Sequence, residues 1–168
     1  MFRPVLFRSL LAAMLVFSAP SVLAAPVSGT EFKDWTVGCE DVGEEGSKTQ
    51  VCHLYQIFTA GENKRPLLRV AVTYLPGEEK PYLVLTMPLG MALPPGVQLQ
   101  IDDGEEQRIP VNTCLPDGCR AGGNMADAMI DALKKGSTLK ISFADMNLKT
   151  ATVPVSLSGF TAGLASLK

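Results

Sequence analysis

The sequence predicts an all-β protein, an antiparallel β-sandwich with one short helix. About eight short segments alternate apolar and polar residues at every second position, as half-buried strands do. Clusters of glycine, proline, asparagine and aspartate separate these segments at the short intervals that are typical of β-sandwiches. One internal segment instead has its apolar residues at helical spacing, so a single helix is expected to pack on the sheets.

The first 24 residues have the three parts of a cleaved secretory signal. Arg3 and Arg8 supply the positive start, and the uncharged run from Leu10 to Phe17 is too short to span a bilayer. Small residues before position 25 fit cleavage after Ala24, which we favour over an uncleaved membrane anchor. We therefore predict one domain over residues 25–168 that is periplasmic or secreted and has no stable membrane span.

The predicted mature chain is acidic. Two of the 15 basic residues and none of the 17 acidic residues lie in the signal. The mature chain then has 13 basic and 17 acidic residues, a net charge of 13 − 17 = −4. This balance argues against a nucleic-acid partner and against electrostatic attraction to an anionic membrane.

The first two predicted strands carry a cysteine each. A strand with Trp35 and Cys39 on one face is followed by an acidic loop over residues 41–50 and by a second strand over residues 51–58. When the chain turns back through this loop, Cys52 approaches Cys39.

The middle of the chain predicts two further strands and a hairpin. Residues 68–74 alternate as a half-buried strand, whereas residues 82–87 (YLVLTM) are apolar on both faces and predict a central strand that is covered on both sides. The pair Asp103-Gly104 is a strong hairpin signal. It connects a strand over residues 97–101 with a return strand over residues 109–111.

The predicted helix covers residues 126–135. Its apolar residues follow the i, i+3, i+4, i+7 pattern of a one-sided helix, with Asn124 as the expected N-cap and Gly136 as the terminator.

Two strands follow, over residues 139–143 and 151–157. Pro154 cannot donate a ladder hydrogen bond, so the second of these strands is expected at an edge or at a bulge. The tail, residues 160–167, is expected to close the core as a turn or short helix.

All four cysteines, Cys39, Cys52, Cys114 and Cys119, lie in the exported part, and an even number in an oxidising compartment predicts two disulfides. Three pairings are formally possible. We predict the local one, Cys39–Cys52 and Cys114–Cys119, because a turn separates the members of each pair. The spacings differ from those of zinc sites and of redox-active C-x-x-C pairs, so a structural role is favoured over both alternatives.

No pattern in the sequence predicts an active site, a cofactor or a metal site. His53 is the only histidine, and no nucleophile elbow accompanies it, so it is interpreted as an ordinary strand residue rather than a ligand or catalytic base. The acidic turn at Asp102, Asp103, Glu105 and Glu106 departs from the spacing of a calcium-binding loop and is interpreted as a solvated hairpin tip. A non-enzymatic protein is therefore expected.

The run Met87, Leu89, Met91, Leu93 beside two prolines is the candidate interaction patch. Methionine-rich surfaces adapt to varied partners, although such residues are more often part of the core. If several of them are exposed together, they form a patch that a partner could cover.

Several motifs together resemble the invasion-associated locus B family. They are FKDWTVGC, MPLGMALPPGVQLQIDDG, the C-x4-C pair with Gly118 before its second cysteine, and the ending VPVSLSGFTAGLASL. The resemblance covers nearly all of the mature chain in order. It implies a small exported bacterial protein with an immunoglobulin-like sandwich fold. The members after which the family is named are associated with bacterial entry into host red cells. It supplies no catalytic residues.

The expected function is that of an exported, non-catalytic cell-envelope protein that recognises an envelope or host macromolecule through its surface. The alternative is a periplasmic carrier that binds a small ligand between the two sheets.

Overall fold

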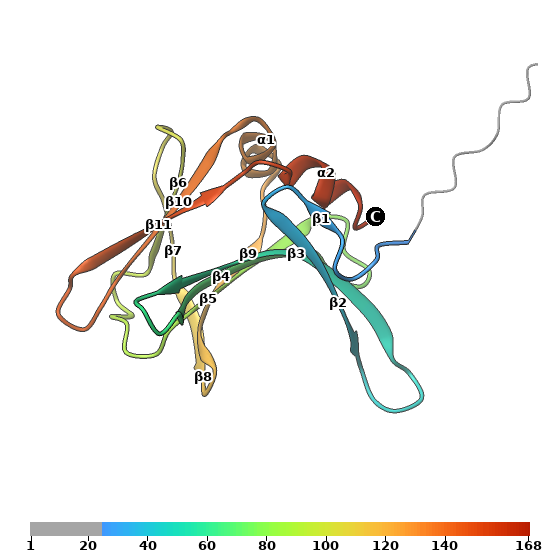
Figure 1. The fold of residues 1–168 in the computed structure, drawn as a ribbon, viewed down its shortest axis with the longest axis horizontal. Coiled ribbons are helices and arrows are strands. Elements are labelled where there is room, and N and C mark those ends of the chain that lie inside the picture. Colours follow the sequence, from blue (N-terminus) through green and yellow to red (C-terminus); the bar gives the residue numbers. More distant parts are fainter. Residues whose placement is uncertain (1–24) are drawn as a thin grey trace, which may run out of the picture.

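The computed structural model describes residues 25–168, so the predicted signal over residues 1–24 lies outside the described residues. The described chain is mostly β: two antiparallel sheets of seven and four strands, with two short helices (Figure 1). This confirms the two-sheet prediction. The immunoglobulin-like strand order implied by the resemblance is not shown by these pairings.

The larger sheet begins as a meander. Its first five strands lie in chain order, after which the chain leaves the sheet and returns to place β9 beside β5 and β8 at the edge. The bounds are β1 (Glu31–Phe32), β2 (Trp35–Val42), β3 (Thr49–Ala60), β4 (Arg65–Tyr74), β5 (Pro81–Met87), β8 (Val111–Leu115) and β9 (Gly118–Asn124).

The smaller sheet has the order β11-β10-β6-β7. Its strands are β6 (Val97–Ile101), β7 (Gln107–Ile109), β10 (Thr138–Ala144) and β11 (Thr150–Ser156). The hairpin between β6 and β7 turns at the predicted Asp103-Gly104 pair. Pro154 lies in β11, an edge strand, as predicted. Proline has no N–H to donate, and at this edge position no neighbouring strand loses a hydrogen bond as a result.

The prediction of one continuous return strand over residues 109–111 is wrong. Ile109 pairs with Val97 in the smaller sheet, whereas Val111 pairs with Ala121 in the larger one. Pro110 separates them and has no N–H to donate to either ladder, so the chain crosses from one sheet to the other at this residue.

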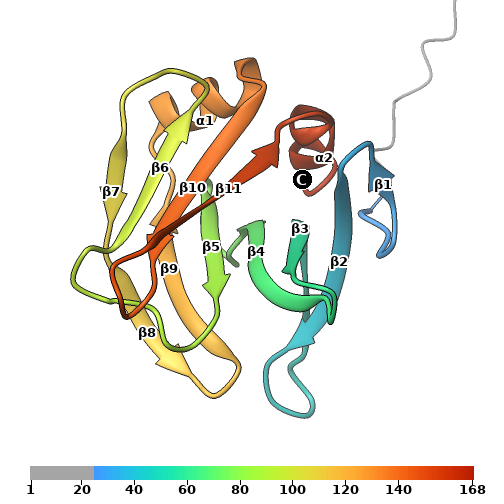
Figure 2. The same cartoon turned by 60° about the vertical axis from the view of Figure 1, so that its left-hand side comes forward.

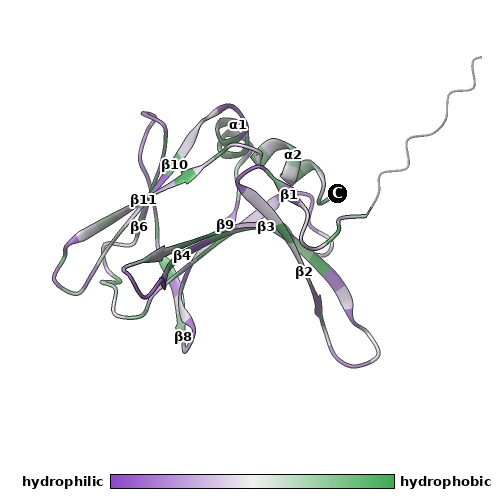
Figure 3. Cartoon of the chain, viewed as in Figure 1, coloured by the Kyte–Doolittle hydropathy of each residue, from purple (hydrophilic) through white to green (hydrophobic). Residues whose placement is uncertain are grey.

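The inward faces of the two sheets form one hydrophobic core. Leu54 and Leu85 from the larger sheet and Ile141 and Val155 from the smaller sheet are completely buried in the same cluster. Hydrophobic residues, green in Figure 3, are visible on β10 and on the two helices.

Two helices close one end of the core (Figure 2). Helix α1 (Asp127–Lys135) confirms the predicted helix and buries Leu133. Helix α2 (Phe160–Ala165) is a second helix beyond the single one in the predicted fold class, and its Phe160 packs on Trp35 with ring centroids 5.3 Å apart. Asn124 is not the helix cap: it ends β9, and Ala126 takes the cap position without a side-chain hydrogen bond.

Hydrogen bonds also join the two sheets. The Trp35 indole Nε1 and the Gln56 amide Nε2 both donate to the Ser156 carbonyl at the end of β11, at 2.9 and 2.7 Å. Because Trp35 and Gln56 are buried, these bonds remove the cost of leaving two polar groups unpaired in the core.

Across residues 25–168, no helix is long and apolar enough to cross a membrane.

Candidate functional site

The larger sheet carries two cross-linked hairpins that project to the same side. In Figure 1 the β2–β3 and β8–β9 hairpins both point away from the smaller sheet, on either side of β4 and β5. Cys39–Cys52 joins directly paired residues of the first hairpin, and Cys114–Cys119 does so in the second. The predicted local pairing is thereby confirmed, and among residues 25–168 no cysteine is free. Two disulfides indicate a protein that folds outside the reducing cytoplasm.

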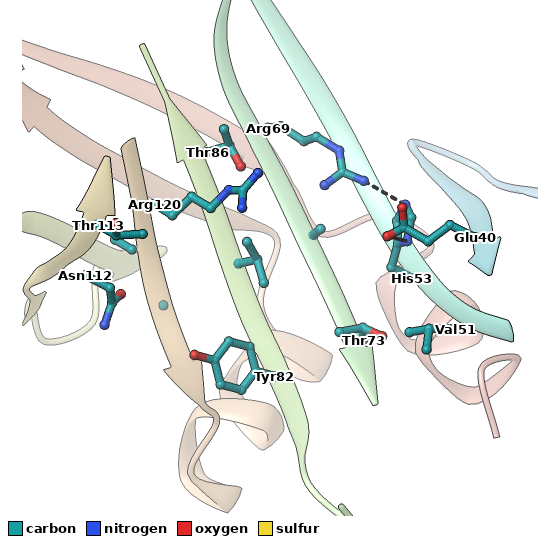
Figure 4. Close-up of a pocket in the computed structure, with 14 residues that line it drawn as sticks. Glu40, Val51, His53, Arg69, Thr73, Tyr82, Thr86, Asn112, Thr113 and Arg120 are labelled. Atoms are coloured by element: carbon teal, nitrogen blue, oxygen red, sulfur yellow. Dashed lines mark hydrogen bonds and ion pairs between the residues drawn. The ribbon is translucent and has the colours of Figure 1, made fainter. Parts of the chain in front are cut away.

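Between the two hairpins, the outer face of the larger sheet forms an open hollow of about 440 Å³, which we call the sheet groove (Figure 4). Strands β2, β3, β4, β5, β8 and β9 all contribute to its lining. The lining residues are Glu40, Val51, His53, Arg69, Ala71, Thr73, Tyr82, Val84, Thr86, Asn112, Thr113, Arg120, Ala121 and Gly122.

Strand register explains the shape of the sheet groove. Ala71 on β4, Val84 on β5 and Gly122 on β9 are directly paired across the three strands. The side chains of Ala71 and Val84 are short and Gly122 has none, so this row forms a shallow floor. Strand β5 was predicted to be covered on both sides, which is wrong. Its inward residues are buried, but its alternate residues face the open groove.

The neighbouring row of paired residues carries two positive charges. Arg69 on β4 is directly paired with Thr86 on β5, which is paired in turn with Arg120 on β9. Because adjacent strands are about 4.8 Å apart, the two arginine backbones lie roughly 10 Å from each other with a hydroxyl between them. Figure 4 shows both guanidinium groups over this part of the groove.

His53 holds Arg69 in position. The Arg69 Nη2 lies 2.7 Å from His53 Nε2, and the guanidinium also lies 5.2 Å from the centre of the Tyr55 ring. Arginine is always protonated, so it must donate, and Nε2 must be the unprotonated acceptor nitrogen of a neutral imidazole. The other ring nitrogen, Nδ1, then carries the proton and faces Glu40 Oε1 at 4.0 Å.

The surroundings of His53 favour this neutral form. Burial lowers the pKa of His53 below its ordinary value of 6.5, the Arg69 charge lowers the pKa further, and Glu40 opposes the shift. In this form His53 accepts a hydrogen bond from Arg69 and orients its guanidinium group within the groove.

A pH dependence of stability follows from this shift. Because the folded pKa is lowered, the unfolded chain binds the proton first as the pH falls through 6.5, and the free energy of unfolding decreases from pH 7.5 towards pH 5.5. His53 is the only histidine, so His53→Gln should remove most of this decrease. Urea unfolding of both proteins at the two pH values measures it, and equal pH dependence in the two proteins would show that His53 is not responsible.

Arg120 has an exposed and replaceable partner. Its Nη2 lies 2.8 Å from Asp117 Oδ2, and both side chains are substantially exposed, at 40% and 62%. A solvent-exposed ion pair of this kind contributes only about 0–1 kcal/mol, so a bound anion can take the place of Asp117 at little cost. Within residues 25–168, Arg69 has no carboxylate within 4.0 Å of its guanidinium.

The structure divides the predicted interaction patch. Met87 and Met91 are in the core, at 2% and 5% exposed, and present almost no surface to a macromolecular partner, whereas Leu89 and Leu93 are 56% and 47% exposed. Met87 is buried because it continues the inward row of β5. The two leucines belong to the loop between β5 and β6, outside the sheet groove.

The acidic turn has a structural role at Asp102. Its carboxylate accepts hydrogen bonds from the backbone N–H groups of Ser137 and Thr138, which fixes the start of β10 beside the β6–β7 hairpin. Asp103 lies 3.3 Å from Lys140 Nζ. No group of three or more potential metal ligands occurs within the described residues.

The sequence reasoning did not identify the sheet groove. The predicted half-buried strand over residues 68–74 contains Arg69, but Arg120 follows a turn cysteine far along the chain and carries no pattern of its own. The available signal was limited to outward-facing polar residues on an interior strand, and only the pairing of β4, β5 and β9 brings those residues into one row.

Comparisons with known proteins agree with the resemblance seen in the motifs. Residues 35–168 match the family described as "Invasion associated locus B (IalB) protein". Two proteins named invasion protein B homolog, from Brucella abortus (strain 2308) and Brucella abortus biovar 1 (strain 9-941), are each 28% identical over 155 residues. These residues cover 92% of this chain and 87% of each homolog.

The crystal structure of invasion associated protein b from Bartonella henselae has a similar fold. It superposes with a TM-score of 0.68 at 24% identity, over 82% of this chain and 92% of that one. Since the family match begins at β2 and continues to the last residue, the chain belongs to the invasion-associated locus B (IalB) family.

Proposed function

We propose that this protein is an exported, non-catalytic binding protein of the bacterial envelope, periplasmic or secreted, which recognises an envelope or host macromolecule through the sheet groove. The observation that carries the proposal is the pair of disulfide-linked hairpins that border the groove on both sides. A covalently braced site loses little conformational freedom on binding, so more of the contact energy is available for affinity. The names of the relatives, which refer to invasion, support a host-facing partner for this family.

The lining of the sheet groove supports binding rather than catalysis. It combines an apolar floor with arginine, threonine, tyrosine and asparagine side chains, which is the mixture that recognition surfaces use for contact area and specificity. His53, the only histidine, accepts a hydrogen bond from Arg69 and is held neutral, so its proton-accepting nitrogen is already occupied.

The test fills the groove with a bulky side chain. Val84→Trp places an indole on the groove floor, at an outward position of an interior strand where aromatic residues are well tolerated. Gln98→Trp is the matched control, since Gln98 is half-buried on the outer face of β6, an interior strand of the other sheet. A photo-crosslinking residue at Asn112, an exposed lining residue on β8, then reports contact with partners in bacterial envelope extracts and host-cell membranes.

We expect one or more discrete crosslinked species in the otherwise unchanged protein and in Gln98→Trp, and at least about a tenfold loss in Val84→Trp, provided both variants unfold at the temperature of the parent. Crosslinking that survives Val84→Trp would place recognition on another surface. No crosslinked species from either source would contradict the proposed use of the groove.

The small-ligand alternative rests on a different recess. Leu67, Leu89, Met91, Phe143 and Ala151 line a hollow of about 240 Å³ where the β5–β6 loop meets the β10–β11 hairpin. Ligand pockets usually measure about 300–1,000 Å³, so this recess is small for a carrier site, and we place it second.

A further inference from the structure

We propose that Arg69, Thr86 and Arg120 form an anion clamp in the sheet groove, and that its ligand is the phosphate monoester group of an organic molecule. This inference rests on the proposed function, because it names the chemistry that the groove recognises. It begins from the register: the three residues are directly paired across β4, β5 and β9 and line the same hollow.

The charges of the clamp are poorly compensated. Arg69 donates to a neutral histidine and has no carboxylate within 4.0 Å among residues 25–168, and Arg120 has only the exposed Asp117. Two guanidinium groups in one hollow repel each other unless an anion lies between them. Since the mature chain is expected to be acidic overall, this pair is a local feature and not part of a general basic surface.

The number of donors favours a phosphate monoester over other anions. Each guanidinium is a rigid fork that can donate two parallel hydrogen bonds, and Thr86 adds a hydroxyl. A carboxylate has two oxygens to share between two forks, whereas a phosphate monoester has three acceptor oxygens. Its charge of about −1.5 to −2 also matches the two arginines, while a sulfate ester carries only one negative charge.

The rest of the groove indicates what the phosphate is attached to. Beside the clamp lies the floor of Ala71 and Val84, and beyond the floor Thr73 on β4 is directly paired with Tyr82 on β5. An aromatic or other flat apolar body attached to the phosphate can therefore lie on the floor, with the tyrosine on its far side. The groove is open to solvent along one face, so the body can also be part of a larger molecule.

Phenyl phosphate is the probe, with phenyl sulfate and benzoate as comparators that have the same ring but different anions. Backbone amide NMR of the disulfide-bonded protein at pH 7.5 measures affinity and location together. We expect phenyl phosphate to shift the amides of Ala71, Val84 and Gly122 in a saturable way, and the two comparators to bind several-fold more weakly.

Three variants test the residues. Arg69→Gln and Arg120→Gln should each weaken phenyl phosphate binding about tenfold or more, the ratio expected for losing charge-assisted hydrogen bonds. Arg108→Gln is the matched control, because Arg108 is an exposed strand arginine on β7 of the other sheet, and it should bind as the parent does. Arg120→Lys keeps the charge and loses the fork, so it should fall between the parent and Arg120→Gln.

Several outcomes would overturn the clamp. They are equal affinity for benzoate and phenyl phosphate, equal weakening by Arg108→Gln, and shifts that centre outside the groove. The failure of the clamp is separable from the failure of the proposed function. A partner lost in Val84→Trp but retained in Arg69→Gln and Arg120→Gln leaves the groove in use and removes the anion chemistry. Binding of phenyl phosphate without any crosslinked macromolecule would support the anion chemistry and contradict recognition of a macromolecule through the groove.

Discussion

Replacing Gly122 with alanine is expected to destabilise the protein by at least about 3 kcal/mol, the largest effect of any single substitution considered. Gly122 has φ +144°, a backbone conformation that residues with a side chain rarely adopt. A Cβ atom at this position would lie 1.9 Å from the carbonyl oxygen of Leu83 and 2.9 Å from its carbonyl carbon. These are backbone atoms of the neighbouring strand β5, so no rotamer change can relieve the overlap.

The structural consequence is a separation of β9 from β5. This pairing carries Arg120 and the β8–β9 hairpin, so Gly122→Ala should also disturb the sheet groove. Thermal unfolding followed by circular dichroism measures the loss, which corresponds to roughly 10 °C for a chain of this length.

Gly123 provides the matched control. It is the adjacent residue on the same strand, but a Cβ atom there meets nothing within 4 Å and its φ is not in the positive region. Gly123→Ala should therefore change stability by less than about 1 kcal/mol, in either direction. If both alanine variants unfold at the parent temperature, the close approach of β9 to β5 is not as described.

Removal of the Cys39–Cys52 disulfide is expected to cost about 3 kcal/mol, and removal of Cys114–Cys119 about 2 kcal/mol. The difference follows from loop length, since the two bridges close sequence separations of 13 and 5 residues, and a longer loop loses more freedom in the unfolded chain when it is closed. Alanine is the replacement of choice because Cys119 is buried and a hydroxyl there would be unpaired.

Unfolding temperatures of the two paired-alanine variants should fall by roughly 10 °C and 6 °C. A reducing agent should lower the unfolding temperature of the parent by about the sum of these two decreases. In each variant it should act only through the one remaining bridge. A variant that unfolds within 1 °C of the parent would show that its bridge does not stabilise the fold. Both variants should also bind partners of the groove more weakly, because each bridge braces one of its walls.

The sequence predicted local pairings well where the signal is itself local. The Asp103-Gly104 turn, the one-sided helix and the two cysteine pairs each depend on residues within a short stretch of chain, and each appears in the structure. Errors arose where a strand ends inside an apparent pattern. Pro110 divides one apparent strand between two sheets, and β5 ends at Met87, so Met87 is buried while Leu89 in the following loop is exposed.

The candidate site could not be predicted in the same way. Arg69 and Arg120 are far apart in the chain, and nothing in the spacing of either one refers to the other. Their proximity depends on β9 pairing with β5 after the chain has passed through the whole of β6, β7 and β8. The resemblance to a family indicated the fold class but supplied no site residues.

By itself, the sequence determined that this chain forms antiparallel strands and one amphipathic helix and closes two short cysteine loops, because alternation, turn residues and loop closure act between near neighbours. Only the tertiary structure decided which strands share a sheet and which polar side chains meet on its outer face. The physical reason is that strand backbones present the same hydrogen-bonding groups to any partner. The choice among partners therefore depends on packing of the entire core and on close approaches such as that of Gly122 to Leu83.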